Sequence, residues 1–411
     1  MADNKDKKVL NVPHLRFPEF RGEWEKCKFG DIATGFDYGM NAAAKPFDGE
    51  NKYIRITDID EASSTYIDKE IVSPDGMLTD NYMVNDRDIL LARTGASTGK
   101  SYLYRKSDGK LYYAGFLIRA NVTKHNPYFV FSQLHTNRYW NWVSIMSARS
   151  GQPGINSQEY SSFPVYVTSM LEEEKISALL SLIDERIATQ NKIIEKLESL
   201  IKGITDTLLC NFSWDKVYLR SFMEFYPTNS FSWEQLNYEK GIIRNLHYGL
   251  IHGISTKRVT TNNLPFISSN IVDSKFVCCQ NGDIAFADAS EDTTDIGKAV
   301  EFTDVDNTFV LCGLHTIHGR DIKGLTVTGF KGFMFNSSYF HKQVRRVAQG
   351  TKVFSISANY LSSCYVYIPD KSEQTKITGL LNAMEMKKSF SSKLLELYKI
   401  QKQFLLRQMF I

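Results

Sequence analysis

A long apolar stripe in the middle of the chain predicts a coiled-coil helix over residues 171–210. Its members recur at alternating spacings of three and four, and one of them is polar: Leu180, Ile183, Ile187, Gln190, Ile194, Leu197, Ile201, Ile204 and Leu208. Lys and Glu occupy the other faces, and no Pro interrupts the series. A core-facing helix gives the same stripe over a short stretch, but about 30 residues of it favour a coiled coil.

A second, less regular stripe predicts another long helix over residues 371–411. Its seam contains Leu380, Met384, Leu394, Tyr398 and Leu405, and it is interrupted by Lys387 and Ser391. Neither helix can bury its stripe alone, so we expect each to be the partner of the other. A pseudo-twofold relation between two equivalent units would make the helices antiparallel, with one globular part at each end.

The two stripes belong to one long unit that occurs twice. Residues 85–90 (NDRDIL) have a counterpart in 280–285 (QNGDIA), and 174–176 (EKI) align with 375–377 (TKI). Their order is preserved while the offset drifts from about 190 to about 200 residues, as in a duplication rather than a solenoid of short repeats.

The remaining parts of each unit, residues 1–170 and 211–370, mix strand and helix patterns. Short apolar runs predict strands at 53–56, 89–91, 116–118 and 165–167, and longer periodic segments predict helices at 127–146 and 332–347. We therefore predict an α+β fold with two repeated globular domains joined by two long antiparallel coiled-coil helices.

Composition narrows the function classes. The 411 residues contain 49 Lys and Arg against 46 Asp and Glu, so any nucleic-acid binding must come from local basic surface. No apolar run is long enough to span a membrane, and the charged N-terminus has no signal-peptide core; we expect a cytoplasmic protein. The six cysteines form no CxxC pair and lack histidines at ligand spacing, which predicts free buried thiols rather than disulfides or a metal site.

Several loops carry candidate nucleic-acid contacts. Residues 93–101 (RTGASTGKS) resemble a phosphate-binding P-loop, but Thr94 stands where that pattern requires its first Gly. Their functional interpretation is a turn that meets phosphates or base edges, and the alternative is a strand connection with solvated charges. Arg55 could read a base or simply be exposed, and the amides of residues 151–156 could read adenine or merely form a turn.

The candidate DNA contacts share polar or basic chemistry in loops or at strand ends. In the first half they are Tyr53, Arg55, Arg93, Thr94, Ser97, Thr98, Lys100, Gln152 and Asn156. In the second half they are Tyr248, His252, Ser255, Lys257, Arg258 and Lys352. An isolated basic loop is more often solvated than functional, so the second group rests on weaker grounds.

In combination, several motifs resemble the specificity (S) subunit of type I restriction-modification systems. In the first half they are residues 15–24, 53–59, 95–100, 114–119 and 151–156; in the second half they are 247–249, 282–292 and 313–317. The resemblance implies two target-recognition domains that read the two halves of an asymmetric bipartite DNA target. Residues 350–352 (GTK) depart from the first half's 151–154 (GQPG), so that loop is expected to work differently.

The resemblance also implies a non-catalytic subunit that scaffolds two methyltransferase and two restriction subunits through faces of the helices at 171–210 and 371–411. The cofactors S-adenosylmethionine, ATP and Mg²⁺ would then sit in those partners, with none in this chain. The sequence shows no methyltransferase tetrapeptide, S-adenosylmethionine loop or HExxH motif. Two alternatives stay open: a coiled-coil adaptor that joins two proteins without DNA, and a self-contained enzyme with an unrecognised site.

Overall fold

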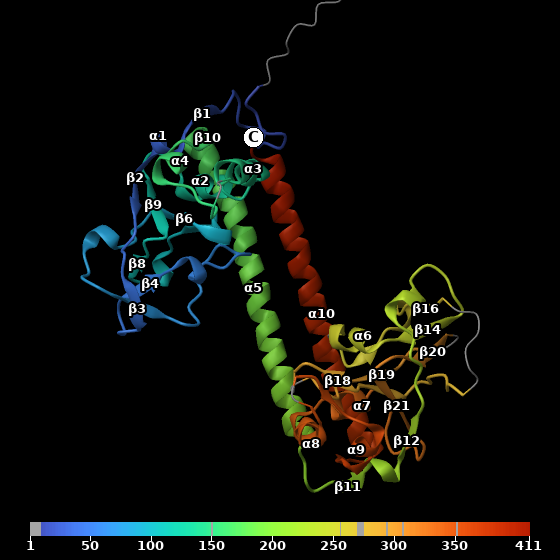
Figure 1. The fold of residues 1–411 in the computed structure, drawn as a ribbon. Coiled ribbons are helices and arrows are strands. Elements are labelled where there is room, and N and C mark those ends of the chain that lie inside the picture. Colours follow the sequence, from blue (N-terminus) through green and yellow to red (C-terminus); the bar gives the residue numbers. More distant parts are fainter. Residues whose placement is uncertain are drawn as a thin grey trace, which may run out of the picture. The chain divides into compact units, whose positions relative to one another are not determined.

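A computed structural model describes residues 10–148, 151–254, 256–268, 275–292, 295–305, 308–350 and 352–411. The chain divides into two compact units, Met1–Thr189 with Leu394–Ile411, and Gln190–Lys393 (Figure 1). Each unit mixes strands and helices around its own core, which confirms the α+β prediction. None of the helices in the described ranges has the length and apolar character needed to cross a membrane.

The first unit is built on a four-stranded antiparallel sheet whose order is β2, β9, β6, β7. Its strands are β2 (Ala33–Tyr38), β9 (Leu117–Val122), β6 (Asp88–Ala92) and β7 (Ser101–Leu103). Three two-stranded pairs surround it: β1 (Glu25–Lys28) with β10 (Pro164–Val167), β3 (Ala43–Pro46) with β5 (Val72–Asp75), and β4 (Lys52–Ile54) with β8 (Leu111–Tyr113). Its short helices are α1 (Phe29–Ile32), α2 (Pro127–Gln133), α3 (Asn137–Met146) and α4 (Ser157–Ser161).

The second unit has a five-stranded sheet with the order β12, β21, β17, β19, β15 and a four-stranded sheet with the order β13, β16, β14, β20. The strands of the five-stranded sheet are β12 (Met223–Tyr226), β21 (Thr316–Asp321), β17 (Ile284–Ala287), β19 (Ala299–Phe302) and β15 (Arg258–Val259). Those of the four-stranded sheet are β13 (Leu236–Asn237), β16 (Phe266–Ile267), β14 (Ile243–Leu246) and β20 (Phe309–Cys312). Two small pairs are β11 (Asp215–Tyr218) with β23 (Tyr365–Ile368), and β18 (Ala289–Ser290) with β22 (Phe354–Ser355). The short helices are α6 (Tyr248–Gly253), α7 (Lys331–Met334), α8 (Ser338–Val347) and α9 (Ala358–Ser363).

Matching hydrogen bonds in the two units support the duplication found in the sequence. Asp88 begins strand β6 and accepts the Asn85 amide at 2.7 Å; Asp283 directly precedes β17 and accepts the Gln280 amide at 2.9 Å. Both carboxylates are buried at the start of a central strand. Because each closes the turn before its strand, the shared residue type has a shared structural cause.

The two shorter helices expected at 127–146 and 332–347 are each broken into two. Helix α3 begins after Thr136, whose Oγ1 accepts the Tyr139 amide, and α8 begins after Ser337, whose Oγ accepts the Phe340 amide. A capping side chain satisfies a backbone donor that a continuous helix would have bonded, so it starts a new helix. The predictions of single helices were therefore wrong in the same way in both units.

Two long helices, α5 (Met170–Leu209) and α10 (Lys371–Gln408), contribute one segment each to both units. Every member of the stripe predicted on α5 is buried or half-buried, which confirms that seam. On α10 the prediction was wrong at Leu380, which is 48% exposed, because the neighbouring Leu381 is fully buried and sets the phase of the helix in the second unit.

In the first unit the helix segments run antiparallel. The Lys402 ammonium lies 2.7 Å from the Asp184 carboxylate, and Arg186 lies over the Tyr398 ring, so the partner number falls as the α5 number rises. The two helix segments form an apolar cluster with residues of the globular part of the first unit. Its buried members are Trp24, Phe129, Ile176, Leu180, Ile183, Leu405, Leu406, Met409 and Phe410. In the second unit, Lys388 of α10 pairs with Glu198 of α5 at 3.5 Å.

Candidate nucleic-acid interface

Two loops of the first unit that were singled out separately in the sequence lie against each other. The Gly95 amide donates to the Pro153 carbonyl at 2.9 Å, and the Ile155 amide donates to the Arg93 carbonyl at 2.9 Å. Thr94 also forms an isolated bridge with Gly154. The structure therefore joins the 93–98 turn, which follows β6, to the 151–156 loop, which precedes α4.

Arg93 lies at this junction with an unused donor. Its guanidinium carbon is 4.8 Å from the centre of the Tyr38 ring, and its backbone amide donates to the Phe116 carbonyl. The Nε atom is buried and has no hydrogen-bond partner among the described residues. Tyr38 and Phe116 are 43% and 59% exposed, so the arginine is flanked by accessible aromatic side chains.

The Gln152 side chain covers the 93–98 turn at the protein surface. Its amide is close enough to Gly95 that a Cβ atom there would be 3.0 Å from Nε2, and Gly95 has a φ of +70°. Thr98 is buried and donates through Oγ1 to the Gly95 carbonyl at 2.8 Å, so it stabilises the turn. Ser97 is partly exposed within the 3₁₀ turn Gly95–Ser97, and Lys100 pairs with Glu61 at 3.3 Å.

Three other candidates of the first unit are engaged within the fold. Tyr53 is only 2% exposed and donates to the Met40 carbonyl at 2.8 Å, so its side chain belongs to the core. Arg55 forms two hydrogen bonds, of 2.8 and 2.7 Å, with the Asp58 carboxylate. Asn156 caps helix α4 by accepting the Glu159 amide at 2.9 Å. These contacts stabilise the fold around the three residues, so Arg93 is the candidate arginine whose Nε lacks a partner among the described residues.

The second unit has the same backbone arrangement with different side chains. There the Asp288 amide donates to the His315 carbonyl, and the Ile356 amide donates to the Asp288 carbonyl. The equivalent pairs in the first unit are Arg93 with Phe116 and Ile155 with Arg93. Asp288 therefore occupies the place of Arg93, and His315 that of Phe116.

Asp288 lies beside a group of aromatic and imidazole rings. The Asp288 carboxylate is 3.1 Å from Nδ1 of His315, and burial raises the pKa of Asp288. The Tyr248 ring packs against His247, His252 and His315, with centroids 4.7, 6.1 and 5.3 Å away. Burial lowers the pKa of His247, so this ring is held in its neutral form.

The remaining candidates of the second unit do not form one cluster. Lys257 is half-buried, and its pKa is lowered by burial despite the charge of Glu385 on α10. Arg258 lies in strand β15 and pairs with Glu301 of β19 in the sheet register, and Lys352 is exposed. Ser255 lies outside the described residues.

Four residues near Arg93 and near its counterpart in the second unit are not among the DNA contacts predicted from the sequence: Tyr38, Phe116, Asp288 and His315. Phe116 and His315 each precede a sheet strand, β9 and β21 respectively, and each accepts the amide of the residue that follows the neighbouring central strand. Carrying the internal repeat through the central strands would have found Asp288, because the alignment of Asp88 with Asp283 places Asp288 opposite Arg93.

Comparison with known proteins gives this geometry a family context. Residues 21–199 match the family described as "Type I restriction modification DNA specificity domain". The fold resembles that of the S subunit of a type I restriction-modification system from M. genitalium, with a TM-score of 0.62 and 13% identity over 97% of this chain and 99% of that one. A structure titled for complex assembly and conformational transition of the type I R-M system gives a TM-score of 0.52 and 14% identity, over 94% of this chain and 97% of that one.

At these identities the structural likeness shows a shared fold, which extends over both units. The family match is confined to residues 21–199 and so covers most of the first unit.

Proposed function

We propose that this chain, whose residues 21–199 form a type I restriction modification DNA specificity domain, reads an asymmetric bipartite target with one unit for each half-site. The duplicated backbone geometry at Arg93 and Asp288 supports this proposal. The same scaffold would present a different side chain to each half-site, and the two halves of the target would therefore differ in sequence.

Arg93 carries the proposal for the first unit. An arginine guanidinium can form the bidentate contact to O6 and N7 of guanine in the major groove, and Nε of Arg93 has no hydrogen-bond partner among the described residues. The exposed Tyr38 and Phe116 add surface for backbone or methyl contacts, and Gln152 adds an amide that can pair with adenine. In the second unit, Asp288 offers an acceptor for the amino group of cytosine, with His315 and Tyr248 beside it.

We also propose that the long helices dock two methyltransferase subunits and two restriction subunits, which hold S-adenosylmethionine, ATP and Mg²⁺. Helix α10 presents an apolar stripe on one face, with exposed fractions between 54% and 68%: Met386, Phe390, Leu397, Ile400 and Phe404. These positions span about 80° around a helix of 3.6 residues per turn. An exposed apolar stripe of this kind is typical of a protein–protein contact.

Changing this stripe should release the methyltransferase subunits. We expect Phe390→Asp with Phe404→Asp to reduce co-purification by at least about tenfold, since each change places a charge in an apolar contact. Lys399→Asp, at an exposed position about 140° away from Met386 around the helix, is the control for added acid, and circular dichroism checks that α10 stays folded. Undiminished co-purification of the folded double variant would remove the stripe from the proposed docking surface.

Exchange of one globular domain tests directly whether each unit recognises one half-site. Replacement of residues 211–370 by those of a related specificity subunit should change one half of the methylated motif and leave the other half and the gap unchanged. The measurement is a map of methylated adenines in cells that express the hybrid with its partner subunits. The reciprocal exchange of residues 1–170 is the matched control and should change the opposite half.

A change in both halves after either exchange would contradict the assignment of one half-site to each unit. Assembly of the complex without any sequence-selective methylation by the unaltered chain would favour the protein–protein adaptor instead. Footprinting on the methylated target adds a second readout, because two readers require two protected blocks separated by an unprotected gap.

A further inference from the structure

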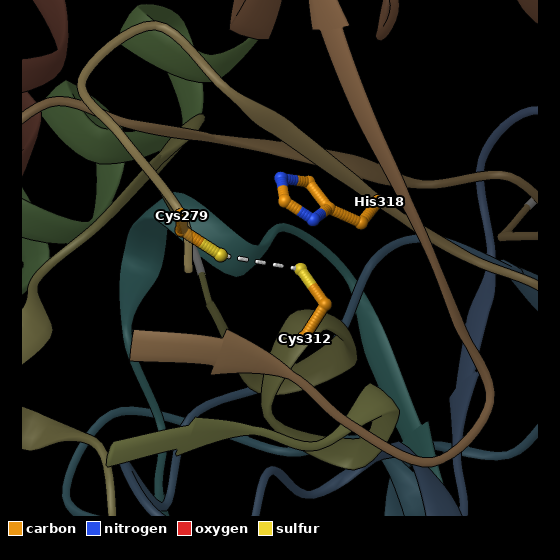
Figure 2. Close-up of side chains that lie close together, drawn as sticks. All are labelled: Cys279, Cys312 and His318. Carbon is orange, nitrogen blue, oxygen red and sulfur yellow. Dashed lines mark hydrogen bonds between the residues drawn. The ribbon is translucent and has the colours of Figure 1, made fainter. Parts of the chain in front are cut away.

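Three buried side chains of the second unit bring potential metal ligands together. Cys279 lies in the segment before β17, Cys312 ends β20, and His318 is in β21. Their ligand atoms all lie within 4.8 Å of one another, and the residues are 5%, 3% and 0% exposed (Figure 2). Their spacing along the sequence matches no common metal motif, so only the fold reveals the cluster.

The His318 ring is oriented for ligation through Nδ1. Its Nε2 lies 2.8 Å from the Asp283 carboxylate, which is itself held by two hydrogen bonds from Arg320. Its Nδ1 is buried without a hydrogen-bond partner among the described residues, and Figure 2 shows the ring beside both sulfur atoms. A neutral imidazole that donates from Nε2 to a carboxylate has its lone pair on Nδ1, and zinc-bound histidines are usually held by such a carboxylate.

The separation of the sulfurs fits two ligands of one ion. Sγ of Cys279 and Sγ of Cys312 are 3.6 Å apart. Zinc–sulfur bonds of about 2.3 Å at the tetrahedral angle place two sulfurs about 3.8 Å apart. A disulfide would require about 2.05 Å. Two thiols in simple contact would have a similar spacing, but they would leave the buried Nδ1 of His318 unexplained.

We propose that Cys279, Cys312 and His318 bind one zinc ion through two thiolates and Nδ1 of the imidazole. Thiolate and imidazole are the ligands that zinc prefers. Each thiol gives its proton to solvent on binding, and the two thiolate charges balance the charge of the ion, so the buried site is neutral. The three protein ligands leave the fourth tetrahedral position to a water molecule.

Such an ion would stabilise the region of the second unit around Asp288 and His315, which we propose to contact DNA. Cys312 and His318 flank the connection between β20 and β21, and this connection carries His315 beside Asp288. Cys279 ties the segment that leads into β17 to the same point. The ion would stabilise the second unit whichever DNA bases that unit contacts.

Metal analysis of the full chain tests the proposal. We expect about one zinc per chain after purification without chelators, measured by inductively coupled plasma mass spectrometry. Cys279→Ser and Cys312→Ser should each lose most of it. The neighbouring Cys278 is exposed, so Cys278→Ser is the matched control and should retain the zinc. Replacement by Co²⁺ should give a thiolate-to-cobalt charge-transfer absorption that is absent from both ligand variants.

Several results would overturn the zinc site. They are a folded wild-type chain that takes up neither Zn²⁺ nor Co²⁺, equal metal loss in Cys278→Ser and Cys279→Ser, or a Cys279–Cys312 disulfide in mass spectrometry of the wild type. If the Cys→Ser variants fail to fold, two measurements on the wild-type chain still test whether it binds zinc. A thiolate–cobalt absorption, together with a melting temperature lowered by a chelator, supports the site, and absence of both rejects it.

Discussion

Arg93→Ala should weaken recognition of the specific DNA target by about tenfold to 100-fold, which corresponds to the roughly 1–3 kcal/mol of discrimination that a bidentate base contact provides. The reason is that the Arg93 guanidinium is positioned over Tyr38 while its Nε lacks a partner among the described residues. Binding by the assembled complex, titrated with target and non-target duplexes, gives the effect directly.

Arg55→Ala is the matched control, because it removes the same side chain from the same unit. The Arg55 guanidinium is already bonded to Asp58, so we expect less than about a twofold change in affinity for DNA. Equal losses in the two variants would mean that a general basic surface, rather than the 93–98 turn, determines binding.

The salt dependence distinguishes the two ways in which Arg93 can contact DNA. Loss of a phosphate contact lowers the slope of log K against log salt by about 0.9 and weakens all sequences alike. Loss of a base contact leaves that slope unchanged and relaxes the methylated motif at one position. We expect the second result, and a uniform loss across sequences would exclude base reading by Arg93.

Glu301→Ala should cost the second unit about 3–5 kcal/mol of its free energy of unfolding, the penalty for breaking a buried ion pair. Glu301 and Lys331 are 0% and 2% exposed, and their charged groups lie 3.4 Å apart. The carboxylate also accepts the amides of Gly329 and Gly332, both at 2.8 Å. Its removal leaves two backbone amides without their acceptor and the buried Lys331 ammonium without its charge partner, with only Thr326 Oγ1 to accept from it.

Hydrogen exchange measured by mass spectrometry localises this effect. Peptides from β17, β19 and β21 should lose protection in Glu301→Ala, whereas peptides from β2, β6 and β9 of the first unit serve as internal controls. The double variant Glu301→Leu with Lys331→Met removes both charges and should be less destabilised than Glu301→Ala. A double variant that is worse than the single one would show that the carboxylate matters chiefly as an acceptor for the two amides.

The two long helices and the duplication could be predicted from the sequence, because periodicity is visible within one segment and a repeat is found by comparing the chain with itself. The stripe on α5 and the correspondence of residues 85–90 with 280–285 both followed from such patterns. The difference between Arg55 and Arg93 could not be predicted, because it depends on which acceptor the folded chain places beside each guanidinium. His318 and its two cysteines were missed for the same reason, since their contacts join three separate segments.

The cluster that seals the first unit has a consequence for biosynthesis. Trp24 and Phe129 pack against Phe410, and Leu405, Leu406 and Met409 belong to the same cluster. A ribosome therefore synthesises the entire second unit, Gln190–Lys393, before the residues that close the core of the first. Throughout that interval the nascent first unit exposes apolar surface, the state in which chains are most prone to aggregate and to engage chaperones.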